Sequence, residues 1–101
     1  MHIVKTVNLY PKPNGSTGTR VAVATSAVAL GITFAQTEYY ALVEIQTNDM
    51  YVTFDGTTPS ATNGFKYTAG TRETWSRQRA AAAKFIQVSA GGAVMVQPLT
   101  D

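Results

Sequence analysis

The chain has no cysteine, a single histidine and few charged residues. Among its 101 residues, charged side chains make up 14% and hydrophobic ones 45%. The lack of cysteine excludes disulfides, thiol catalysis and cysteine-bound metal centres. The histidine, His2, stands next to the amino terminus, where chains usually fray, so a histidine-dependent triad is not expected. A surface so poor in charge favours stable contact with partners.

Strong charge and long apolar runs are also missing. The formal net charge of +2 is too small to indicate a nucleic-acid partner by itself. The densest basic cluster (Arg72, Arg77, Arg79 and Lys84, with Trp75 and Phe85 between them) is interpreted as a solvated or protein-contacting face. The most apolar stretch, Arg20–Ala35, is about 16 residues long, short of the roughly 20 that span a bilayer. We expect no membrane association, no signal peptide and no nucleic acid.

What the sequence does contain is a succession of short β-forming runs between turn residues. These runs predict one domain over residues 1–101, an all-β, jelly-roll-like β-sandwich of about seven or eight short strands. A run of four alanines predicts a short helical turn near Arg79–Lys84. The expected strands cover residues 3–9, 19–30, 40–47, 50–55, 65–69, 73–77, 85–90 and 93–99.

Three pairs of these runs are separated by only two or three residues and are predicted to be β-hairpins. The turns are Asn48-Asp49, Gly70-Thr71 and Gly91-Gly92. Within the run 40–47, alternate apolar residues at 41, 43 and 45 predict a core-facing side.

No arrangement of residues predicts catalysis or metal binding. The six carboxylates (Glu38, Glu44, Asp49, Asp55, Glu73 and Asp101) are scattered, and we interpret them as solvated strand ends and turns. The run Asp55–Pro59 lacks the glycines and the lysine of a phosphate-binding loop, so we interpret it as a turn. We therefore expect no cofactor, no metal and no enzymatic activity.

One part of the chain resembles a known group of proteins. The run VTFDGTTPSATNG at residues 52–64, followed by YTAG at 67–70, ETW at 73–75 and AKFI at 83–86, is similar to small structural proteins of tailed bacteriophages. The likeness covers roughly residues 40–99. It implies a virion protein made in the host cytoplasm, most simply a capsid decoration (cement) protein on the capsid surface. Its implied partners are the major capsid protein and its own copies, as a homotrimer. It carries over no catalytic residue.

On this hypothesis, the amino-terminal segment and the proline-rich loop after it contact the capsid, and exposed aromatics contact neighbouring subunits. The candidate capsid contacts are His2, Ile3, Val4, Lys5, Pro11, Lys12 and Pro13. The candidate subunit contacts are Tyr39, Tyr40 and Trp75. Two alternatives stay open: a head-to-tail connector or a tail or fibre subunit, and a carbohydrate-binding module that uses Tyr10, Tyr51 and Tyr67.

Overall fold

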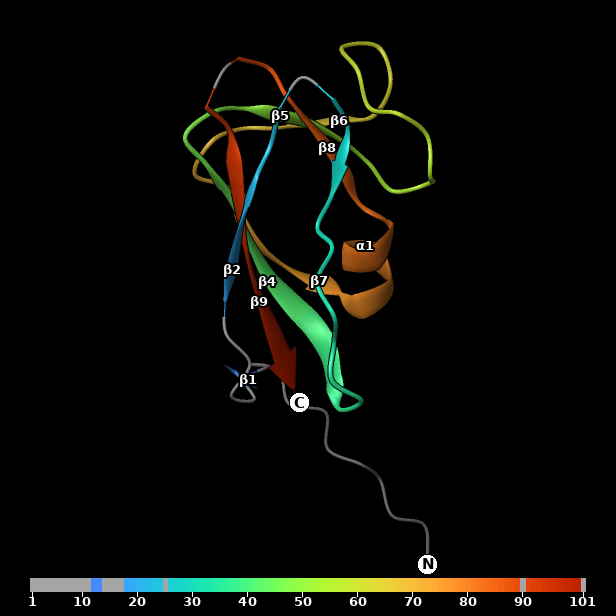
Figure 1. The fold of residues 1–101 in the computed structure, drawn as a ribbon, viewed down its shortest axis with the longest axis vertical. Helices are drawn as coiled ribbons and strands as arrows, with labels where there is room; N and C mark the ends of the chain where they lie inside the picture. The colour runs from blue at the N-terminus through green and yellow to red at the C-terminus, as the bar shows by residue number, and fades with distance from the viewer. Residues whose placement is uncertain (1–11, 14–17, 25, 90, 101) are drawn as a thin grey trace, which may run out of the picture.

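The computed structural model describes residues 12–13, 18–24, 26–89 and 91–100 (Figure 1). Within them the chain forms nine β-strands and one short helix, so the all-β prediction is confirmed. The predicted strand at residues 3–9 lies outside the described residues. The elements are β1 (Lys12–Pro13), β2 (Thr19–Ala22), β3 (Val28–Ala29), β4 (Glu38–Gln46), β5 (Met50–Thr53), β6 (Phe65–Tyr67), β7 (Arg72–Ser76), α1 (Arg77–Ala82), β8 (Lys84–Gln87) and β9 (Ala93–Thr100).

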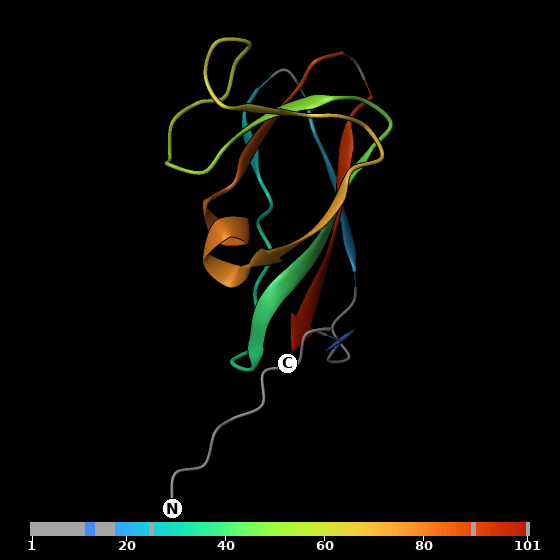
Figure 2. The ribbon, with the colours of Figure 1, turned by 180° about the vertical axis from the view of Figure 1, so that it is seen from behind.

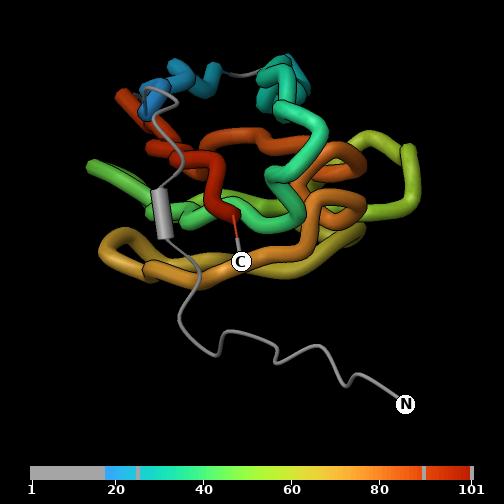
Figure 3. The backbone as a smooth tube through the Cα atoms, turned by 90° about the horizontal axis from the view of Figure 1, so that it is seen from below, coloured from blue at the N-terminus to red at the C-terminus, as the bar shows by residue number. Residues whose placement is uncertain are grey.

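The strands form two antiparallel sheets. Sheet A has the order β1-β9-β4-β7, with β2 also paired to β9, and sheet B has the order β3-β8-β5-β6. Each sheet therefore has an early strand at one edge, β2 or β3, and a later strand at the other edge, β7 or β6. Seen end on, the early strands lie on one side of the molecule and the β6–β7 segment on the opposite side (Figure 3).

The pairing is nested, which identifies the topology. β5 pairs with β6, β4 with β7, β3 with β8 and β2 with β9. This is one long hairpin whose tip is the β5–β6 connection. The hairpin is rolled up so that β4 also pairs with β9 and β5 with β8. Rolling a doubled chain into two facing sheets gives a jelly roll, as the sequence predicts.

The three predicted hairpins are wrong. The turns at Asn48-Asp49, Gly70-Thr71 and Gly91-Gly92 each carry the chain from one sheet to the other, because β4, β7 and β9 belong to sheet A and β5, β6 and β8 to sheet B. The predicted strand over residues 19–30 is likewise divided between β2 and β3, in different sheets. A strand can bury its inward-facing apolar residues against the opposite sheet as well as beside a hairpin partner. The alternation of apolar residues therefore does not show which strand is its hydrogen-bonded neighbour.

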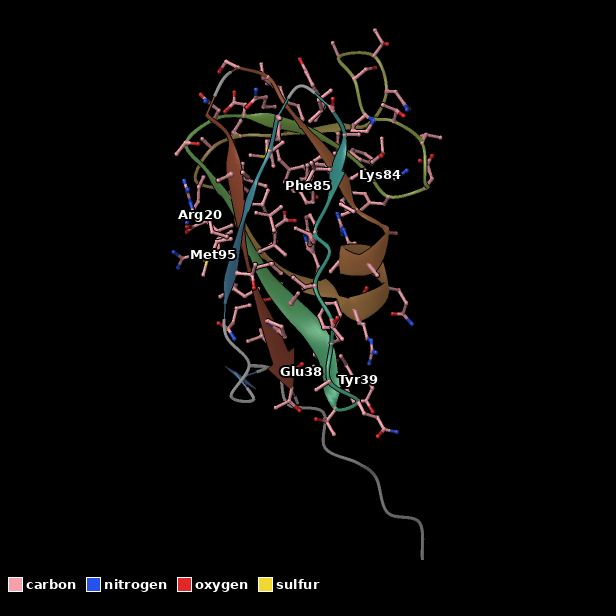
Figure 4. The ribbon with its side chains drawn as sticks, viewed as in Figure 1. Arg20, Glu38, Tyr39, Lys84, Phe85 and Met95 are labelled. Atoms are coloured by element: carbon pink, nitrogen blue, oxygen red, sulfur yellow. The ribbon has the colours of Figure 1, made fainter. Side chains whose placement is uncertain are left out.

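The core lies between the two sheets. Sheet A supplies Val43 opposite Val96 and Ile45 opposite Val94. Sheet B supplies Val52 opposite Phe85, and all six of these side chains are buried. Figure 4 shows Phe85 in the space between the sheets. The predicted core face of residues 41, 43 and 45 is confirmed.

Helix α1 closes one side of the sandwich. It starts at Arg77, two residues before the predicted turn, because the Ser76 side chain caps it by accepting a hydrogen bond from the Arg79 amide at 3.1 Å. Ala80 is buried against the core, and the chain becomes extended again at Ala83. A helix this short depends on that packing.

Candidate functional site

A line of aromatic side chains runs from the core to the surface on the side where β6 and β7 form the sheet edges. At its inner end Phe85 and Trp75 are stacked, with ring centroids 6.0 Å apart and planes 8° apart. Phe54 meets Trp75 edge-on at 5.2 Å, and Tyr67 does so at 5.8 Å. Phe65 is the outermost member, 6.1 Å from Phe54 and 64% exposed. We call these five residues the aromatic line.

Arg79 of α1 covers the middle of the aromatic line. Its guanidinium lies 4.4 Å from the ring centroid of Phe54 and 5.3 Å from that of Trp75, and it donates a hydrogen bond of 2.7 Å to the Tyr67 hydroxyl. The Trp75 indole nitrogen donates to the Glu73 carboxylate at 2.8 Å. Cation–π contact and hydrogen bonds together hold these polar groups in fixed orientations.

A groove of about 320 Å³ opens beside this arrangement, between the edge strands β6 and β7. Figure 2 shows these strands and α1 framing this side of the molecule. Thr68 and Thr71, whose hydroxyls lie 3.1 Å apart, are part of its lining. We call it the β6–β7 groove. Its lining residues are Phe65, Lys66, Tyr67, Thr68, Thr71, Glu73 and Arg79.

A second hollow of about 240 Å³, which Phe65 also lines, lies against the loop that joins β5 to β6. We call it the loop hollow. Phe65 is a wall of both hollows, so the two are neighbours that share one aromatic ring. The lining residues of the loop hollow are Thr53, Phe54, Asp55, Asn63, Gly64 and Phe65.

The loop beside this hollow, residues 55–64, is held by its own hydrogen bonds. The Asn63 side-chain amide donates to the Thr57 hydroxyl and to the Thr58 carbonyl, both at 2.9 Å. The Thr53 hydroxyl donates to the Thr57 carbonyl at 2.6 Å. Lys84 reaches across from β8 and donates to the Gly56 carbonyl at 3.1 Å. The loop is therefore fixed by side chains at both of its ends.

Two titratable groups near the hollows have shifted pKa values. Burial of the Tyr67 phenol raises its pKa above the ordinary value of 10.0, and the nearby Arg79 charge only partly offsets this. Hydrogen bonds from the Thr57 hydroxyl and amide lower the pKa of Asp55. At neutral pH the groove therefore presents a neutral phenol and the loop hollow a carboxylate.

The outer face of sheet A is a second uncovered surface. Arg72 pairs with Glu44 at 2.6 Å, and Arg20 donates to the Gln46 side chain at 2.9 Å. Hydrogen bonds from Gln46 and then from Arg72 lower the Glu44 pKa. A hollow of about 350 Å³ lies here between Leu42, Glu44, Arg72, Met95 and Gln97. Arg20 and Met95 project together from this face in Figure 4. Exposed ion pairs of this kind contribute little stability.

The predicted capsid contacts fall mostly outside the described residues. His2, Ile3, Val4, Lys5 and Pro11 are in that part of the chain. Lys12 and Pro13 form β1, which pairs with Thr100 and Leu99 at the end of β9. This places β1 at the lower end of the molecule in Figure 1, away from the loop at residues 55–64.

The predicted subunit contacts lie in three different environments. Tyr39 is 49% exposed, because the ladder between β4 and β9 shifts register between Glu38 and Tyr40 and leaves Tyr39 unpaired. Tyr40 is half-buried, opposite Ser76 and Leu99. Trp75 is only 2% exposed and belongs to the core, so it offers no surface to another subunit in this structure.

The basic cluster seen in the sequence is dispersed. Arg72 lies on the outer face of sheet A, Arg79 lies over the aromatic line, and Lys84 holds the 55–64 loop. Arg77 lies 5.5 Å from the ring centroid of Phe34. The interpretation of all six acids as solvated is wrong for Glu38, which is buried and accepts a hydrogen bond from the Ala35 amide at 2.6 Å.

Of the three tyrosines proposed for sugar contact, Tyr67 lines the groove, Tyr51 is half-buried in β5, and Tyr10 is outside the described residues. Sequence reasoning missed Phe65 as a surface residue. The signal that could have found it is the spacing of Phe65 and Tyr67, which places both rings on one face of an edge strand. It also missed Arg79 as the residue that holds the rings together.

In the described part of the chain, no three or more His, Cys, Asp or Glu side chains gather into a possible metal site. The one helix found there is too short to cross a membrane. Comparison with protein-family models, with curated proteins and with solved structures found no match.

Proposed function

We propose that this protein is a structural protein of a bacteriophage virion that binds the outer surface of the capsid and stabilises contacts between capsomers. The observation that carries the proposal is the sequence resemblance over roughly residues 40–99. The jelly-roll sandwich supports it, because viral capsid proteins commonly use this architecture. The major capsid protein and further copies of the chain, as a homotrimer, are the partners.

Two regions are the contact surfaces in this proposal. The amino-terminal segment, with Lys12 and Pro13 at its end, contacts the capsid. Tyr39 and Tyr40 at the start of β4, with the outer face of sheet A beyond them, contact sister subunits. The half-buried Leu42 and Met95 add apolar area to that face. Small areas of contact suffice when many copies bind, because each bound copy stabilises the assembled state over the free one.

Capsid binding can be measured directly. Purified protein is titrated onto undecorated capsids, which are then heated. We expect saturable uptake and a higher temperature of capsid disruption. A chain without residues 2–9 is expected to lose uptake, while Phe65→Ala, matched for the loss of an exposed side chain, is expected to keep it. Absence of saturable uptake by the full chain contradicts the proposal.

Native mass spectrometry tests the assembly of the 10.8 kDa chain. A trimer agrees with decoration, whereas a ring of higher order favours the connector alternative. Tyr39→Asp is expected to shift the trimer toward monomer, because it places a charge in the subunit contact. Ala61→Asp, a change in the exposed loop at residues 55–64 and outside the proposed subunit contact, is the control for added charge alone.

A further inference from the structure

The β6–β7 groove and the loop hollow meet at the exposed ring of Phe65. Their volumes, about 320 and 240 Å³, lie near the lower limit of small-molecule sites, roughly 300 Å³. A ligand that fills both must pass over the shared ring, so it is elongated and divided into two units. Two such units joined end to end describe a short chain molecule better than a compact cofactor.

The lining combines an apolar face with fixed polar groups. The 64% exposed Phe65 ring supplies the apolar face. The β6–β7 groove adds Tyr67 and Glu73 as polar groups, and the loop hollow adds Asp55 and Asn63. A pyranose ring has the matching form, since its C–H groups present an apolar face and its hydroxyls form a polar rim that both donates and accepts hydrogen bonds.

These polar groups are oriented before any ligand arrives. Tyr67 is held by Arg79 at 2.7 Å, and Glu73 by the Trp75 indole at 2.8 Å. Asn63 is held by two hydrogen bonds within its own loop. Side chains that are already fixed lose little freedom on binding, which favours affinity for a ligand that is itself semi-rigid.

The charges argue against a nucleic acid. Asp55 and Glu73 place one carboxylate in each hollow, where a phosphate would be repelled. Lys66 lies 3.8 Å from Asp49, and Arg79 is turned onto the aromatic rings. Addition of a peptide as an extra strand beside β6 is also disfavoured, because β6 has only three residues with which it could pair.

From these observations we infer that the β6–β7 groove and the loop hollow form a binding site for a neutral oligosaccharide, with Phe65 as the stacking platform between two sugar units. The site does not depend on capsid binding. If the chain binds a capsid through β1 and the segment before it, the loop at residues 55–64 lies at the far end of the molecule (Figure 1). The sugar site would then be directed toward the surroundings of the particle.

The test begins with the full chain on an array of neutral, amino and acidic di- to tetrasaccharides. The best neutral binder is then titrated against ¹⁵N-labelled protein by NMR. We expect a dissociation constant on the order of 1 mM, because the hollows are open. The amide signals that move are expected to be those of residues 55–68 and 71–73.

Three variants sharpen the test. Phe65→Ala is expected to weaken binding at least about tenfold, which corresponds to about 1.4 kcal/mol. Glu73→Gln preserves the shape of the groove and is expected to weaken binding severalfold, which keeps the test valid if Phe65→Ala folds poorly. Val88→Ala removes part of another exposed apolar side chain, 43% exposed and in the lining of neither hollow, and is expected to leave glycan binding unchanged.

Failure of every glycan to bind overturns the inference, as does preferred binding of acidic glycans or of a peptide to the same amides. Equal binding by Phe65→Ala and the unmodified chain also overturns it. Capsid uptake measured on the same preparations separates this outcome from failure of the proposed function, because uptake is expected to survive Phe65→Ala.

Discussion

The two ends of the aromatic line use the same kind of side chain for different purposes. Phe85 at the inner end is completely buried, while Phe65 at the outer end is 64% exposed. Burying a large apolar side chain contributes roughly 1.5–3 kcal/mol to folding, and the exposed ring forgoes most of that gain. The inner end therefore stabilises the sandwich, and the outer end is free to contact something else. Position in the fold, not residue type, decides which of these aromatic rings is buried and which is exposed.

The largest expected effect on stability comes from truncating the ring at the inner end of the aromatic line, and truncating the ring at the outer end is its comparison. Phe85→Ala is expected to lower the free energy of unfolding by about 3–5 kcal/mol, because it removes the ring stacked on Trp75 and leaves a cavity. Phe65→Ala is expected to cost less than about 1 kcal/mol. Urea denaturation followed by tryptophan fluorescence measures both. Similar losses for the two variants would remove the distinction between the ends.

The backbone at the outer end is expected to be much less tolerant than its exposed side chain. Gly64 has φ +111°, and an added Cβ would lie 2.6 Å from the Val52 carbonyl oxygen. Gly64→Ala is expected to cost about 2–3 kcal/mol. Gly70 has φ +91° with open space around it, so Gly70→Ala is the matched control at about 1 kcal/mol. Equal melting temperatures of the two variants would show that contact with the Val52 carbonyl does not make Gly64→Ala more costly than Gly70→Ala.

The smallest expected effect is a pH dependence in the middle of the line. The pKa of Tyr67 is raised in the folded state, so folding favours its protonated form. The contribution of this phenol is fully present below its unfolded pKa and is lost as the pH rises past about 10. The stability of the unmodified chain relative to Tyr67→Phe is therefore expected to fall between pH 9 and 11, as measured by denaturation at each pH. If the difference in stability between the two proteins stayed constant across that range, the pKa of Tyr67 would not be raised by folding.

Most of the strands predicted from the sequence are present in the structure, but none of the three predicted hairpins is. The buried apolar residues at 41, 43 and 45 alternate regularly with less buried residues, so the strand β4 could be predicted from the sequence directly. The pairing of β4 with β9 joins residues about fifty positions apart, such as Val43 and Val96, and no local turn signals it. Two-residue turns that tolerate positive φ serve arches between sheets as well as hairpins. At Thr47 the chain adopts φ 69° beside the first of these arches.

The candidate site was predictable only in part. Tyr67 was identified as a possible sugar contact from residue type alone, and the run Asp55–Pro59, interpreted as a turn, does lie in the loop between β5 and β6. The shared role of Phe65, Glu73 and Arg79 could not be read from the sequence, since they come from β6, β7 and α1 and meet only when the two sheets close. The burial of Glu38 was also not predicted: the residue lies opposite Thr100 at the far end of the chain, and no local pattern signals that pairing.

By itself the sequence determined the all-β class, the positions of the principal strands and the inward-facing set of apolar residues, because these follow from side-chain alternation and turn chemistry within a few residues. The tertiary structure alone decided which strands are neighbours, which aromatic ring is buried and which is exposed, and which polar groups face the same hollow. Those outcomes depend on closing long loops to bury both sheet faces at once, and that free energy belongs to the whole chain rather than to any segment of it.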